Sequence, residues 1–90
     1  MAQDGAHYWI VAEIYYQPPM SGYRGGRRVR PVHGERFPTD MNVECSKAIR
    51  EKYALGTRLR MRVKLTDKEG GREFLMADRM SNYPLVGPDK

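Results

Sequence analysis

Cysteine is nearly missing from this chain of 90 residues, and the single one present is Cys45. One thiol cannot close an internal disulfide, and it cannot build a zinc site of the multi-cysteine type. The chain is therefore neither a disulfide scaffold nor a zinc ribbon. We predict a reducing environment for it, which favours a cytoplasmic location.

Long apolar runs are missing as well. The longest, residues 8–12, is far shorter than the ~20 residues that cross a bilayer as a helix. Residues 1–5 have neither the basic start nor the apolar segment of a signal peptide. We therefore expect no membrane partner.

Motifs with a recognisable catalytic chemistry are the third absence. The glycines at 22, 25 and 26 do not spell a phosphate-binding loop, and neither GxxxxGK[ST] nor GxSxG occurs. His7 and His33 lie far apart and have no neighbour at metal-ligand spacing. We expect a domain that is not an enzyme and holds no metal or other cofactor. Catalytic residues that converge from distant positions stay open as an alternative.

The composition that remains is that of a small globular domain. Apolar residues make up 40% of the chain and charged residues 30%, which argues against full disorder. We predict one domain over residues 1–90, with flexible tails at 1–6 and 87–90. A core of this size is only modestly stable, so association into a homodimer would help it.

The positive charge is concentrated in one half of the chain. The formal net charge is +5, yet residues 1–45 carry five cations and five anions, whereas residues 46–90 carry eleven cations and six anions. A basic balance attracts polyanions, although many basic proteins bind none.

β-Branched and aromatic residues predict a strand over residues 7–16. Both of its faces are partly apolar, so we expect a central strand. Prolines and glycines predict a loop over 17–26. Residues 27–33 then predict a short cationic edge strand, because Pro31 fits an edge better than the middle of a sheet. Residues 34–40 look irregular.

A helix is predicted over residues 43–55. The i, i+3, i+4, i+8 spacing of apolar residues gives it a buried side made of Cys45, Ala48, Ile49 and Tyr53. Asn42 or Ser46 is expected to cap its start, and Gly56 is placed where a left-handed C-terminal cap is common.

The clearest pattern is an unbroken alternation over residues 57–65. Five side chains point to the core, namely Thr57, Leu59, Met61, Val63 and Leu65. Residues 66–71 read as a hairpin loop, 72–77 as the return strand and 83–86 as a last short segment. In the simplest register Lys64 faces Glu73, and Arg62 faces Leu75.

These elements predict a β-rich α+β fold, with a small curled antiparallel sheet or partly open barrel and one helix over it. An SH3-like barrel is one of several compact arrangements that the pattern leaves open.

The polar face of the alternating strand is the first candidate site. It consists of Arg58, Arg60, Arg62 and Lys64. Same-face residues of a strand lie about 6.7 Å apart, so four of them form a stripe ~20 Å long. Such a stripe could contact several phosphates, and arginine can donate two hydrogen bonds to one phosphate. A solvated outer face of a hairpin explains the same pattern.

The second candidate is the loop that interleaves arginine with glycine and an aromatic residue. Its cations are Arg24, Arg27, Arg28 and Arg30, and its Tyr23 is the best candidate for stacking on a base, followed by Tyr15. A flexible hairpin loop kept soluble by charge explains the same composition, and a single copy of the pattern is weak evidence for binding.

The two candidates together predict a nucleic-acid-binding module of low sequence specificity, because contacts to a backbone carry little sequence information. The partner would be single-stranded or structured nucleic acid. The alternative is a protein-interaction module, an adaptor or inhibitor that recognises an acidic partner surface.

Overall fold

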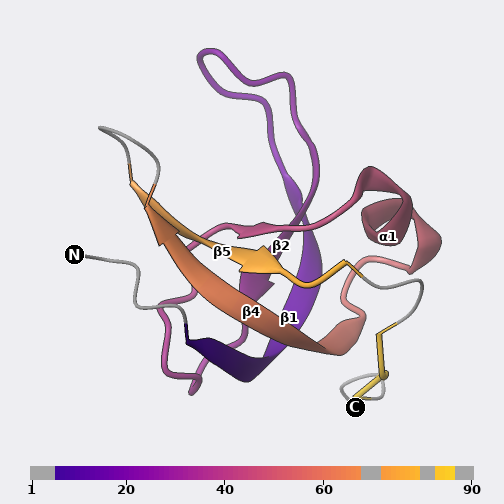
Figure 1. Cartoon of the computed structure of the whole chain (residues 1–90). Helices are drawn as coiled ribbons and strands as arrows, with labels where there is room; N and C mark the ends of the chain where they lie inside the picture. The colour runs from indigo at the N-terminus through magenta and orange to yellow at the C-terminus, as the bar shows by residue number, and fades with distance from the viewer. Residues whose placement is uncertain (1–5, 68–71, 80–82, 87–90) are drawn as a thin grey trace.

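A five-stranded sheet, curled almost into a barrel, forms the body of the computed structural model (Figure 1). The structure describes residues 6–67, 72–79 and 83–86. Nearly all of the predicted tails, and residues 68–71 of the predicted loop, lie outside the described residues. The predicted α+β, β-rich class is confirmed.

In chain order the elements are β1 (His7–Gln17), β2 (Gly26–Pro31), β3 (Val43–Glu44), α1 (Lys47–Lys52), β4 (Arg58–Asp67) and β5 (Glu73–Ala77). They form one sheet in the order β2-β1-β4-β5-β3. All neighbours are antiparallel except β3 and β5, which are parallel. Within the described ranges, no helix is long and apolar enough to span a membrane.

The long strand β1 is central, as predicted. Its first half pairs with β4, and its second half pairs with β2. Ala12 and Glu13 have partners on both sides, so the strand passes from one half of the curled sheet to the other at this point.

The sheet ends at β2 on one side and at β3 on the other, which leaves a seam between them. The predicted edge position of β2 is confirmed, and Pro31, which lacks an N–H, is tolerated there. A side-chain hydrogen bond crosses the seam, because Arg28 Nε donates to Asn42 Oδ1 at 3.3 Å. The barrel is therefore nearly closed and is not sealed by a backbone ladder.

The core is apolar, and no charged or polar side chain is buried among the described residues. The alternation predicted for β4 holds, since Leu59, Met61 and Val63 are fully buried. The remaining core residues are Ile10, Ala12, Ile14, Val29, Val43, Ile49, Leu75 and Tyr83.

The helix is shorter than predicted. Residues Val43–Glu44 form β3 instead, where Val43 is buried opposite Leu75. Ser46 is the N-cap, one of the two predicted, and its Oγ accepts a hydrogen bond from Ile49 N at 3.3 Å. The pairing of Val43 removes the first turn of the predicted helix, because tertiary contacts override a weak helical propensity.

Two details of the predicted helix are wrong for the same reason. Ala48 is exposed, because a helix of six residues buries only Ile49. Gly56 does have a positive φ of 89°, but α1 ends before it. The glycine lies in the turn that leads into β4, and its N–H donates to Ile14 O at 2.7 Å.

The predicted register between β4 and β5 is also wrong. Lys64 lies opposite Met76, and Leu65 lies opposite Leu75. The predicted register differed by three residues, an odd number, which would have placed Leu75 on the arginine face. Burial of Leu75 sets the observed register, and β4 consequently extends through Asp67.

Candidate nucleic-acid interface

The four cations of β4 lie on the outer face of the sheet, as the alternation predicts. Opposite them on β1 lie Glu13, Val11, Trp9 and His7, which pair in that order with Arg58, Arg60, Arg62 and Lys64. Ile14 N donates to Thr57 O, so the four outer pairs are the non-hydrogen-bonded pairs of this ladder. Side chains approach more closely in such pairs than in hydrogen-bonded ones. We call this surface the β1–β4 face.

The cations of the β1–β4 face differ in how far they reach solvent. Arg60 is exposed, whereas Arg58 and Lys64 are half-buried. Arg62 keeps 44% of its side chain exposed, although its Nη1 lies 3.2 Å from Asp78 Oδ2. The Nε atom of Arg58 is buried, so Arg60, Arg62 and Lys64 are the part of the predicted stripe most available to a ligand.

Asp78 is the carboxylate that restrains this stripe. Its Oδ1 lies 3.7 Å from His7 Nε2, so it contacts the face from two sides. Its backbone is held independently, because its N–H donates to Arg62 O at 2.9 Å and its carbonyl accepts from Tyr83 Oη. The position of Asp78 thus does not depend on its ion pairs.

The arginines of the second candidate site approach the cationic stripe of β4 at Glu13. Arg30 Nε lies 3.4 Å from Glu13 Oε1, and its guanidinium lies 4.1 Å from the centroid of the Tyr15 ring. The backbone pairs Glu13 with Arg30 on one side and with Arg58 on the other. One carboxylate therefore lies between the two groups of arginines.

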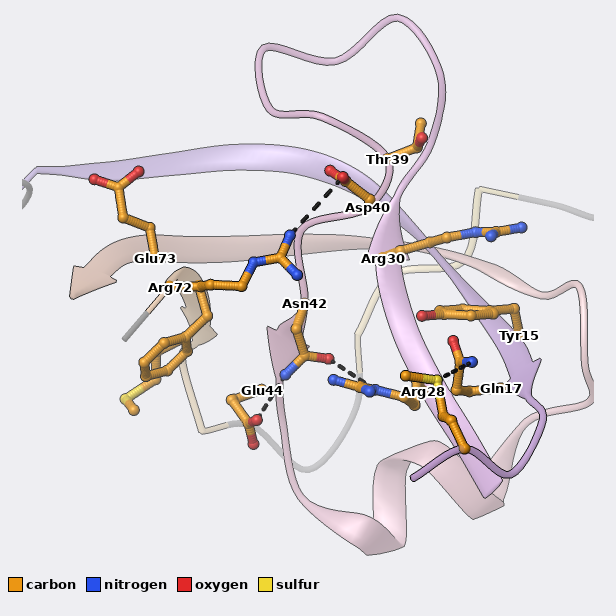
Figure 2. Close-up of a pocket in the computed structure, with 13 residues that line it drawn as sticks. Tyr15, Gln17, Arg28, Arg30, Thr39, Asp40, Asn42, Glu44, Arg72 and Glu73 are labelled. Carbon is orange, nitrogen blue, oxygen red and sulfur yellow. Dashed lines mark hydrogen bonds and ion pairs between the residues drawn. The ribbon is translucent and has the colours of Figure 1, made fainter. Parts of the chain in front are cut away.

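Arg28 continues the same face of β2 but is tied to its neighbours (Figure 2). It donates to Asn42, which in turn donates through Nδ2 to Glu44 Oε2 at 2.6 Å. Its guanidinium also lies 5.2 Å from the centroid of the Tyr23 ring. Tyr23, the predicted stacking residue, is therefore already engaged by an arginine of β2.

Arg27 and Arg24 do not join this face. Arg27 Nη1 donates to Tyr53 O at 3.0 Å, which fastens β2 to the segment after α1. Arg24 is exposed in the hairpin between β1 and β2, where Met20 and Tyr23 exchange two backbone hydrogen bonds of 2.8 Å. Of the predicted loop cations, the structure brings Arg28 and Arg30 toward the stripe, and it separates Arg24 and Arg27 from it.

A groove of about 760 Å³ lies over the seam, beside this second cluster (Figure 2). Its charges balance, with Arg28, Arg30 and Arg72 facing Asp40, Glu44 and Glu73. Arg72 and Asp40 approach to 3.9 Å, and both are largely exposed. A groove with matched charges does not favour a polyanion, so the β1–β4 face is the better candidate.

Ranking the aromatic residues by sequence placed Tyr23 and Tyr15 above Trp9, whereas the structure favours Trp9. It is 53% exposed, and it lies directly opposite Arg62. Other aromatic rings are engaged within the fold, including Tyr8 with Phe37 and Tyr15 with Arg30. The signal in the sequence was its odd position in β1, which places it on the face away from the core.

Two further features bear on chemistry. Burial raises the pKa of the Cys45 thiol to about 11, so this cysteine is a poor nucleophile at neutral pH. Among the residues that the structure describes, no group of three or more His, Cys, Asp or Glu side chains is placed to hold a metal ion.

Comparison with protein-family models, curated proteins and solved structures gives no match for this chain.

Proposed function

We propose that this domain is a nucleic-acid-binding module, not an enzyme, and that it contacts phosphates through the β1–β4 face. The observation that carries the proposal is the register of β1 and β4. It aligns Arg60, Arg62 and Lys64 on one outer face with an exposed tryptophan opposite Arg62. Cations that flank an aromatic ring are the arrangement used by proteins that bind single strands.

The charge of this surface supports an anionic ligand. Together with Arg28 and Arg30, the outer face of β2, β1 and β4 carries six cations. Two carboxylates lie beside them, Glu13 next to Arg30 and Asp78 next to Arg62. An excess of cations over carboxylates leaves a positive potential, which attracts a polyanion and steers its approach. Phosphate contacts carry little base information, so specificity for sequence is expected to be low.

The test is the binding of a fluorescent thymidine decamer across a salt series, with a variant carrying R60S, R62S and K64S. Each phosphate contact to a single strand adds about 0.7 to the slope of affinity against salt on logarithmic axes. Three lost contacts therefore lower the affinity by up to about 100-fold near 0.1 M salt, and they flatten the slope by about 2.

A matched control removes three exposed cations outside this face, through R24S, K47S and R72S. It loses the same net charge, and we expect it to bind almost like the wild type. Equal losses in the two variants would show that net charge alone is responsible. No binding by the wild type at low salt would contradict the proposed function.

The groove over the seam favours a second candidate, the recognition of a protein. Met20 and Met76 line it and are 58% and 48% exposed, and methionine adapts to varied apolar partners. Complex formation with a candidate protein, retained in the R60S/R62S/K64S variant and lost in M20S/M76S, would support this role.

A further inference from the structure

The exposure of Trp9 to solvent is not explained by any ring contact within the described residues. Trp9 lies in the first half of β1, at a position where the neighbouring outer residues of that strand are His7 and Val11. Within the described residues, its ring forms neither an aromatic pair nor a cation–π contact. A tryptophan that is 53% exposed on a strand leaves a large apolar surface in water.

The other rings of the same surface are occupied. Arg30 lies over Tyr15 at 4.1 Å and Arg28 over Tyr23 at 5.2 Å, both measured to the ring centroid. A cation of the protein itself therefore already lies over each of these two rings. Trp9 is the aromatic side chain of the β1–β4 face with a ring that is open to a ligand.

The cations around Trp9 are placed to bind the phosphates of a nucleic-acid strand when one of its bases stacks on this ring. Arg62 is its direct cross-strand partner in a non-hydrogen-bonded pair, and Arg60 and Lys64 are the diagonal neighbours on β4. Direct partners lie about 5 Å apart and diagonal ones about 7–8 Å apart. A base on the indole and its adjacent phosphates thus fall within reach of one small group of side chains.

We infer that Trp9 is a stacking platform for an unpaired base and makes the β1–β4 face selective for single-stranded nucleic acid. The inference rests on the proposed function. In a duplex, the faces of the bases are covered by one another and only their edges are accessible in the grooves. Stacking on Trp9 therefore requires a base that is not paired, whereas phosphate contacts alone do not.

The chain offers a direct probe, because Trp9 is its single tryptophan. The experiment titrates the protein with a thymidine decamer and, separately, with a decamer of abasic sugar phosphates that carries the same charge. We expect the thymidine decamer to quench the tryptophan fluorescence and to bind about tenfold more tightly than the abasic one. A duplex of the same length should bind without this quenching, because its bases are paired and cannot stack on Trp9.

The variants are W9L, which removes the ring, and W9F, which keeps an aromatic face. W9L should bind both decamers with the lower, abasic affinity, and W9F should recover part of the difference. Y16L is the matched control, because Tyr16 is 52% exposed and lies on the opposite face of β1. It should bind like the wild type, and circular dichroism checks that each variant is folded.

Equal affinity for the thymidine and abasic decamers, or an unchanged affinity of W9L, would overturn this inference and leave the proposed function intact. Failure of both decamers to bind at low salt would overturn the proposed function, and the stacking role with it. Equal losses in W9L and Y16L would also overturn the inference, because they would assign the effect to general surface apolarity.

Discussion

The two arginine-rich regions of this molecule look alike in sequence and differ in what their side chains do. In the region of β2, Arg27 is bonded to a backbone carbonyl, Arg28 to an asparagine, and Arg30 to a carboxylate and a tyrosine ring. On β4, Arg60 is exposed, and Arg62 remains 44% exposed beside its ion pair. The first group mainly holds the fold together, whereas the second is available to a ligand.

The difference teaches that a count of cations does not identify a binding surface. A guanidinium that already donates to the protein must lose those bonds before it can bind a phosphate, which reduces the net gain. Glycine-rich arginine segments are commonly associated with flexible contacts to nucleic acid. Here the segment ends in an ordered strand whose arginines have partners.

The largest expected contrast is in stability, between Arg27 and Arg60. R27S should lower the free energy of unfolding by about 1.5 kcal/mol, because a half-buried carbonyl loses a hydrogen bond from a charged donor. R60S should change it by less than about 0.5 kcal/mol, as is usual for an exposed residue. Urea unfolding of both variants measures their free energies of unfolding. Equal values for R27S and R60S would contradict this prediction.

The second contrast concerns Asp78, which restrains the β1–β4 face. D78N should release Arg62 and raise the affinity for a thymidine decamer about fivefold near 0.1 M salt, the gain expected from one phosphate contact. Hydrogen bonds to the backbone of Asp78 hold this position, so the backbone should stay in place in the variant. E51Q, on the exposed side of α1, removes the same charge and should have a much smaller effect. A D78N affinity at or below the wild-type value would show that Asp78 does not restrain Arg62.

The smallest contrast separates charge from stacking at Arg30. R30K keeps the cation near Glu13 but loses the planar group over Tyr15, whereas R30S loses both. We expect R30S to lower the free energy of unfolding by about 1 kcal/mol and R30K by about half of that. Thermal unfolding compares them, and a stability of R30K equal to that of R30S would assign the effect to the ring contact alone.

Much of the fold follows from local pattern. The alternation over residues 57–65 predicted both the core side and the cationic side of β4, because side chains of a strand point to alternate faces. The apolar character of both faces of β1 predicted its central place, and Pro31 predicted the edge. Ser46 was among the predicted helix caps, since its hydroxyl can satisfy a free N–H at the start of α1.

The sequence by itself therefore determined that this is a β-rich domain in which one strand has a cationic outer face, because strand periodicity and turn residues are local properties. Tertiary structure alone decided that Val43 joins β3, that Leu75 sets the register of β5, and that Arg27 and Arg30 are engaged whereas Arg60 is free to reach solvent. The physical reason is that register and side-chain partners depend on contacts between residues far apart in the chain. Those contacts are selected by burial of the whole core, which no short segment encodes.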